Sequence, residues 1–171
     1  VHILVNNVGG LFARKLISEM DEEFYNLLMN VNFKSVFLVT KAIKPLMPKG
    51  GSIINISSQA ARDGGGPGSS LYSASKGAVT SYTRALAKEF GPEGIRVNAI
   101  TAGMTSTRFH DDFTSDDVRK RVANATPLRR EGEPMEIADL ATYLASDSSS
   151  YITGTNIDIN GGILNLSLIH I

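Results

Sequence analysis

The stretch LYSASKGA at residues 71–78 carries the central pattern of this chain, a tyrosine and a lysine four positions apart. Through residues 72–90 apolar side chains recur at steps of three and four, which predicts a helix with one buried stripe. The stripe would consist of Ala74, Ala78, Val79, Tyr82, Ala85, Leu86 and Phe90. Positions i and i+4 share a helix face, so Tyr72 and Lys76 would project together. We expect the ammonium to lower the phenol pKa from its usual value of about 10, which would suit general acid–base chemistry. Taken alone, the spacing favours an ordinary surface pair, because Tyr-x-x-x-Lys pairs are common on helices.

A second pattern lies directly upstream, where GSIINISS at residues 51–58 is rich in β-branched residues and ends in hydroxyls. This run predicts a buried strand whose carboxyl end presents Ser58. In open α/β sheets, ligands bind beyond the carboxyl ends of the strands. A glycine-rich loop joins this strand to the helix, so Ser58 and Tyr72 are expected to face one site.

The rest of the chain alternates between strand-like and helix-like segments. The runs at 2–5 and 93–100 end in turn residues and predict strands, and residues 156–162 alternate as a last strand closed by a glycine turn. Amphipathic runs at 21–45 and 133–144 begin with acidic residues and predict helices. The run at 2–5 is continuously apolar and closed by a turn, which predicts a strand of a buried parallel sheet.

The chain resembles the short-chain dehydrogenase/reductase family, on its 3-oxoacyl-(acyl-carrier-protein) reductase and sugar or polyol dehydrogenase branch. The matching motifs are Asn6-Asn7-Val8-Gly9, Asn32, Ser58, Tyr72-Ser73-Ala74-Ser75-Lys76, Arg96-Val97-Asn98 and Asp158-Ile159-Asn160-Gly161-Gly162. The family has alanine where Val8 stands and proline where Ala102 stands. The resemblance implies a Rossmann-like, doubly wound parallel sheet, of which this chain holds the C-terminal four strands and their helices.

From this resemblance we expect residues 1–163 to be the C-terminal part of a single Rossmann domain and the chain to be N-terminally truncated. Neither G-x-G-x-x-G nor G-x-x-x-x-G-K-[ST], the phosphate-binding loops, occurs in the sequence. Residues 164–171 leave the family pattern and are interpreted as a read-through scar.

The resemblance also implies an NAD(P)-dependent oxidoreductase that interconverts a carbonyl and a secondary alcohol. Tyr72 would be the general acid or base, and Lys76 would tune it and reach the nicotinamide ribose. Ser58 would donate a hydrogen bond to the substrate oxygen, and the backbone carbonyl of Asn32 would hold a relay water. Cofactor contacts are expected from Asn6, Asn7, Gly9, Tyr72, Lys76, Gly103, Met104 and Thr107. The choice between NAD and NADP stays open, and the polar segment 108–124 would be a mobile lid over the substrate.

Each site residue also has a more ordinary interpretation. Asn6 and Asn7 could be turn residues, Asn32 a satisfied core asparagine or a kink, and Thr107 a helix cap.

Three other functions stay open for the chain as a whole. It could be an inert fragment that cannot bind the dinucleotide, or a non-enzymatic scaffold. Ser73 and Lys76 also match the S-x-x-K pattern of penicillin-binding serine hydrolases.

Composition excludes several other classes of protein. The 171 residues are 42% hydrophobic and 20% charged, which is typical of a globular domain. Lys plus Arg equals Asp plus Glu at 17 each, so the charge favours neither nucleic acid nor an anionic membrane as a partner. The sequence has no cysteine, no secretory leader pattern and no apolar run of about 18 residues, which favours a cytoplasmic protein.

Partners and ligands follow from the same reasoning. His2, His110 and His170 lack a second ligand at metal spacing, so no metal is expected. The expected partner is a small carbonyl or alcohol substrate. The family's homotetramer would pack the helices that begin near Asp21 and Tyr72.

Overall fold

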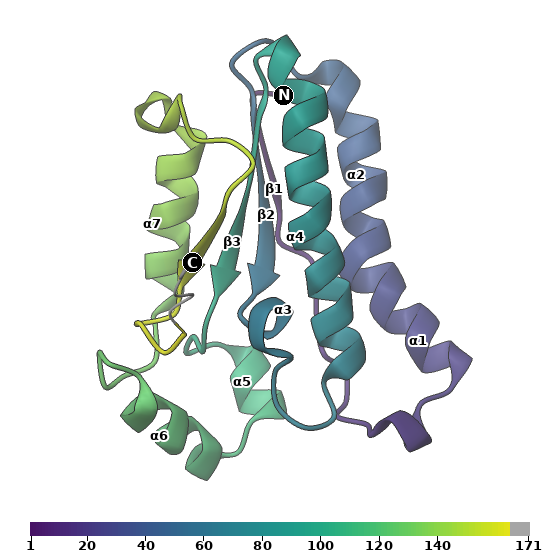
Figure 1. The fold of residues 1–171 in the computed structure, drawn as a ribbon, viewed down its shortest axis with the longest axis vertical. Helices are drawn as coiled ribbons and strands as arrows, with labels where there is room; N and C mark the ends of the chain where they lie inside the picture. The colour runs from purple at the N-terminus through teal and green to yellow at the C-terminus, as the bar shows by residue number, and fades with distance from the viewer. Residues whose placement is uncertain (165–171) are drawn as a thin grey trace, which may run out of the picture.

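A computed structural model describes residues 1–164, and residues 165–171 lie outside the described part. Apart from Leu164, the tail interpreted as a scar therefore falls outside it. Four parallel strands form one sheet in the order β1-β2-β3-β4 (Figure 1). They are β1 (Ile3–Asn6), β2 (Ser52–Ser58), β3 (Arg96–Ala102) and β4 (Asn156–Ile159). The predicted α/β fold with a parallel sheet is confirmed.

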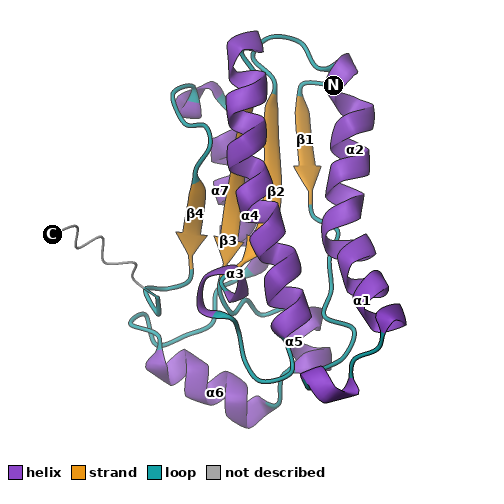
Figure 2. Cartoon of the chain, turned by 45° about the vertical axis from the view of Figure 1, so that its right-hand side comes forward, coloured by secondary structure: helices purple, strands orange, loops and turns teal. Residues whose placement is uncertain are grey.

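Within residues 1–164, seven α-helices lie on the two faces of this sheet or beyond the carboxyl ends of its strands. They are α1 (Glu22–Met29), α2 (Ser35–Ile43), α3 (Ala60–Asp63), α4 (Ser70–Phe90), α5 (Arg108–Phe113), α6 (Asp116–Ala125) and α7 (Pro134–Ala145). A π-helical segment, η2 (Asn30–Lys34), joins α1 to α2, and short 3₁₀ turns occupy Ile17–Glu19, Lys44–Leu46, Gly91–Glu93 and Asp147–Ser149. Figure 1 shows α1, α2 and α4 on one side of the sheet and α7 on the other. Helices α5 and α6 lie beyond the carboxyl ends of the strands (Figure 2).

Alternate residues of the strands belong to two hydrophobic clusters, one on each face of the sheet. Ile53 and Val97 pack with Leu86 and Phe90 of α4 on one side. On the other side, Ile54 and Ile100 pack with Leu144 of α7. Burial on both faces of β2 explains why its apolar residues Ile53 and Ile54 are adjacent rather than alternating with polar ones.

The buried face of α4 differs from the predicted stripe. Val79, Leu86 and Phe90 are buried as expected, but Ala74 and Ala85 are exposed. Hydroxyl residues replace them on the buried face; Thr83 Oγ1, for example, donates to Val79 O at 2.9 Å. A threonine that satisfies its hydroxyl within its own helix can be buried at little cost, so apolar periodicity alone misplaced the face.

Strand β1 forms one end of the sheet. The family's strand order predicts an exposed edge there, and the structure confirms the exposure, since Ile3 is 50% and Val5 is 45% accessible. Among the helices of residues 1–164, none is long and apolar enough to cross a membrane.

Candidate active site

A cleft of about 1270 Å³ opens at the carboxyl ends of the strands. Ser58 at the end of β2, together with Tyr72 and Lys76 at the start of α4, forms part of its wall. The lid helices and α7 supply the opposite wall with apolar side chains, among them Phe109 and Ile137. The structure therefore brings together the three residues predicted from separate segments of the sequence.

Tyr72 lies in the first turn of α4 and is half-buried. The ring of Phe109, on α5, lies against it with 5.8 Å between ring centroids and an interplanar angle of 38°. Burial raises the pKa of the Tyr72 phenol, and contact with the Ser58 hydroxyl partly opposes that rise. The phenol is therefore protonated at neutral pH.

Lys76 lies one turn further along α4 and is only 4% exposed. Its Nζ donates to the carbonyl oxygen of Ile56 at 2.9 Å and lies 5.9 Å from the centroid of the Tyr72 ring. Burial lowers the pKa of the Lys76 amine to about 8. The expectation that Lys76 lowers the Tyr72 pKa is therefore wrong for this structure, because desolvation dominates at both groups and favours their neutral forms.

The position of Ser58 depends on contacts between β2 and its neighbours. Ser58 Oγ accepts a hydrogen bond from the Ala60 N–H at 3.2 Å, at the entry to α3. The preceding hydroxyl, Ser57 Oγ, donates to the carbonyl oxygen of Lys76 at 3.0 Å. This bond fixes α4 against the end of β2, so the serine and the tyrosine have a defined separation.

Asn32 lies in the π-helical segment and is fully buried. Its side chain clamps Gly10, accepting from the Gly10 N–H and donating to the Gly10 carbonyl oxygen, both at 2.9 Å. The same amide donates to Leu28 O at 3.0 Å. Both ordinary interpretations of Asn32 are thus seen, a satisfied core asparagine and a distorted helix, and the relay water stays a prediction.

Most of the predicted cofactor contacts lie on the cleft. Besides Tyr72 and Lys76, they are Asn7, Gly9, Gly103, Met104 and Thr107. The prediction that Asn6 contacts the cofactor is corrected, because Asn6 does not line the cleft. Its amide donates to Thr40 Oγ1 on α2 at 3.1 Å and to Asn55 Oδ1 on β2 at 2.8 Å, so its side chain is buried between the sheet and α2. In a strand, neighbouring side chains point to opposite faces, which separates Asn6 from Asn7.

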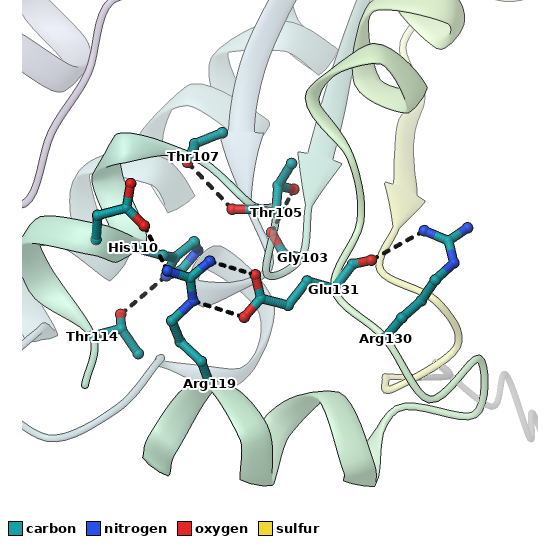
Figure 3. A network of polar contacts seen from close by, with 9 residues as sticks. Gly103, Thr105, Thr107, His110, Thr114, Arg119, Arg130 and Glu131 are labelled. Atoms are coloured by element: carbon teal, nitrogen blue, oxygen red, sulfur yellow. Dashed lines mark hydrogen bonds and ion pairs between the residues drawn. The ribbon is translucent and has the colours of Figure 1, made fainter. Parts of the chain in front are cut away.

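The segment predicted as a mobile lid contains two helices fastened by ion pairs. Arg119 on α6 pairs with Asp111 at 2.5 Å. It also pairs with Glu131 at 2.7 Å, as Figure 3 shows. His110 Nδ1 lies 3.0 Å from Thr114 Oγ1 in the same network. Few apolar residues anchor this segment, as its composition indicated, but its charges hold it to the loop before α7.

The cleft wall also contains residues that the sequence did not single out, among them Arg14, Phe109 and His110. No local motif marks Arg14, because its partners Pro67 and Phe113 are far away in the sequence. Phe109 and His110 lie within the segment predicted as a lid. The signal that could have pointed to Phe109 is the pair of aromatic residues, Phe109 and Phe113, in an otherwise polar segment.

Ser73, which a serine hydrolase would need as its nucleophile, is buried beside the cleft rather than exposed to it. Its Oγ donates to the carbonyl oxygen of Gly64 at 2.5 Å. The amine of Lys76 is engaged with Ile56 O and not with this hydroxyl. This geometry does not support the hydrolase alternative. Within residues 1–164, no cluster of three or more potential metal ligands occurs, and His170 lies beyond that range.

Comparison with known proteins gives consistent matches over almost the whole chain. A family model described as Enoyl-(Acyl carrier protein) reductase matches residues 1–164. The 3-oxoacyl-[acyl-carrier-protein] reductase FabG of Thermotoga maritima is 40% identical over 96% of this chain and 66% of its own length. An uncharacterized short-chain type dehydrogenase/reductase of Sinorhizobium fredii is 38% identical over 95% of the chain and 65% of its length.

Solved structures agree with these sequence matches. A short-chain dehydrogenase/reductase, glucose/ribitol dehydrogenase, from Brucella melitensis superposes with a TM-score of 0.90 at 32% identity, over 96% of this chain and 66% of that one. A blue fluorescent protein from a metagenomic library, solved in complex with NADPH, gives a TM-score of 0.89 at 34% identity with the same coverage. The chain thus spans about 66% of the length of the relatives it matches.

Proposed function

We propose that this chain, which belongs to the short-chain dehydrogenase/reductase family, carries the catalytic residues of an NAD(P)-dependent oxidoreductase. The reaction would interconvert a carbonyl and a secondary alcohol. One observation carries the proposal: the phenol of Tyr72, the hydroxyl of Ser58 and the amine of Lys76 share one wall of a large cleft.

The cleft fits the nicotinamide end of a dinucleotide. Gly9 and Gly103 line it without side chains, and a Cβ on Gly9 would lie 2.8 Å from Lys76 Nζ. A flat ring and ribose could therefore approach the backbone and the amine closely at this point. An ammonium has three donors and Ile56 O takes one, which leaves Lys76 donors for ribose hydroxyls. When bound, the nicotinamide group supplies the hydride of the reaction.

The protein's own residues transfer the proton to or from the substrate oxygen. Burial keeps the Tyr72 phenol protonated at neutral pH, which is the state that donates a proton to a nascent alkoxide. Ser58 donates a hydrogen bond to the same oxygen and stabilises its developing charge. In the reverse direction the phenol must first lose its proton, so alcohol oxidation would be favoured by higher pH.

Two features support proposals about substrate and assembly. The lid and α7 line the cleft with apolar side chains such as Phe109, Val118 and Ile137, which suits a substrate with an apolar portion. Relatives from Thermotoga maritima and Chlamydia trachomatis are named 3-oxoacyl-[acyl-carrier-protein] reductases, and we propose a substrate of that type. We also propose a homotetramer that packs α1, α2 and α4 against other subunits; exposed Tyr25 and Phe37 on α1 and α2 support a subunit contact there.

The test is the Tyr72→Phe variant of the complete gene product, assayed by nicotinamide absorbance with a 3-oxoacyl substrate. Loss of the proton donor should lower kcat by about 10²–10⁴-fold while the circular dichroism spectrum is retained. The matched control is Ser73→Ala, one residue along α4, which should keep normal turnover. Near-normal turnover in Tyr72→Phe would remove this residue from its role, and loss of turnover in Ser73→Ala alone would favour a hydrolase.

A second measurement separates a working site from an inert one. NADPH fluorescence is titrated with the 171-residue chain and with the complete gene product. Saturable binding to either form that weakens in Lys76→Met supports the proposed site, whereas binding unaffected by this substitution contradicts it.

A further inference from the structure

We propose that Arg14 is a positioning residue that joins three segments of the cleft rim and so holds α5 over Tyr72. The inference rests on the proposed role of Tyr72, but its main readout does not. Arg14 lies between β1 and α1 and lines the cleft. Its Nε donates to the carbonyl oxygen of Phe113, at the end of α5, at 3.1 Å. Its Nη1 donates to the carbonyl oxygen of Pro67, in the loop before α4, at 3.2 Å.

The loop at 64–68 packs against the backbone of Arg14 and holds that backbone in place. The Lys15 N–H donates to the carbonyl oxygen of Gly68 at 3.1 Å. Gly68 has a φ of +77°, and a Cβ there would lie 3.0 Å from the Cβ of Arg14 and 3.1 Å from the Lys15 nitrogen. The loop thus packs backbone to backbone against Arg14, in a place where only glycine fits without strain. Because the side chain starts from an anchored position, its other contact can restrain α5.

Helix α5 transmits that restraint to the proposed catalytic phenol. The ring of Phe113 lies 5.4 Å from the ring of Phe109, edge to face. Phe109 in turn lies against Tyr72, with 5.8 Å between centroids. Arg14 therefore holds the end of a short aromatic row whose other end covers the phenol and limits its access to water.

The guanidinium suits this task better than an ammonium. Its planar fork presents donors in fixed, divergent directions, so one side chain reaches two carbonyl oxygens on separate segments. Both partners are neutral carbonyls, so the contact depends on hydrogen-bond geometry rather than on ion pairing. A lysine at this position would keep the charge and lose the fork.

The test compares Arg14→Met and Arg14→Lys with the parent in the complete gene product, by hydrogen exchange of backbone amides. The control is Arg84→Met, which removes an exposed arginine from α4 away from the cleft. The reporters are the α5 amides of His110, Asp111 and Thr114, which bond within that helix. We expect both Arg14 variants to exchange about tenfold faster there, with β2 unchanged, and Arg84→Met to match the parent.

Kinetics give the second readout. A loosened lid should raise KM more than it lowers kcat, and greater access of water should move the Tyr72 limb of the pH–rate profile to lower pH. Unchanged α5 exchange in Arg14→Met, or full protection in Arg14→Lys, would overturn the inference. Exchange is independent of chemistry, so a failure of Tyr72 as proton donor would show in the Tyr72→Phe assay and leave this readout intact.

Discussion

Lys76 combines a positive charge with near-complete burial. Its amine donates to one carbonyl oxygen, that of Ile56, and burial lowers the amine pKa to about 8. The residue types and their spacing were predictable, since Tyr72 and Lys76 share a helix face in any α-helix. The ionisation states of the two residues were not predictable. They depend on how Ile56, Phe109 and the lid exclude water, and these residues are distant in the sequence.

The buried amine predicts a specific pH dependence of stability. Between about pH 8 and pH 10.5 the folded Lys76 has lost its proton, while the unfolded lysine, at its ordinary pKa of 10.5, still binds it. The unfolded state binds more protons in this window, so stability rises with pH. Relative to Lys76→Met, the free energy of unfolding should increase by up to about 3 kcal/mol across it.

Urea unfolding of both proteins at a series of pH values measures this difference. Lys88→Met, on the exposed side of the same helix, controls for the loss of one charge. Parallel pH profiles for the parent and Lys76→Met would contradict the burial-driven shift.

The π-helical segment shows that the shape of one element can depend on its contact with another element. The sequence predicts one helix from Asp21 to near Pro45, and the structure interrupts it at Asn30–Lys34. The interruption surrounds Asn32, whose side chain binds Gly10 across 22 positions of sequence. Helix existence was therefore predictable from periodicity, but the distortion was not, because its cause lies in another element.

Two neighbouring glycines give a matched test of this contact. A Cβ on Gly9 would lie 2.8 Å from both Asn32 Oδ1 and Lys76 Nζ, whereas one on Gly10 would meet nothing closer than 3.5 Å. Gly9→Ala should therefore lower stability by about 1–3 kcal/mol and reduce turnover by displacing the amine. Gly10→Ala keeps its backbone bonds to Asn32 and should be nearly neutral. Denaturant unfolding and steady-state kinetics measure both effects, and equal behaviour of the two variants would refute the close packing.

At the scale of the whole molecule, the parallel sheet was predicted from the family resemblance that the motifs carry, and the ligand site at its carboxyl edge from the rule for open α/β sheets. Motifs at the strand ends also located the site, since Ser58, Asn7 and Gly103 all line the cleft. The sequence did not show how the rim is held together. Arg14, Arg119 and Glu131 form contacts between segments that no local period relates.

The β1 end of the sheet should govern self-association of the 171-residue chain. Within residues 1–164, β1 pairs only with β2, so its other edge presents unpaired backbone groups. Ile3 stands opposite Ser52, whose hydroxyl bonds to Leu144 O, so its side chain points to the α7 face, and it is 50% exposed there. A strand edge beside exposed apolar surface favours pairing with another chain.

Ile3→Lys places a charge beside that edge and should shift the chain toward monomer in light scattering, with the helical spectrum retained. Ile17→Lys is the matched control, because Ile17 is 78% exposed but lies in a 3₁₀ turn away from the sheet. If general surface hydrophobicity drove association, the more exposed Ile17 would respond at least as strongly as Ile3. A response confined to Ile3→Lys identifies the strand edge as the cause, since the two substitutions add the same charge and remove the same side chain.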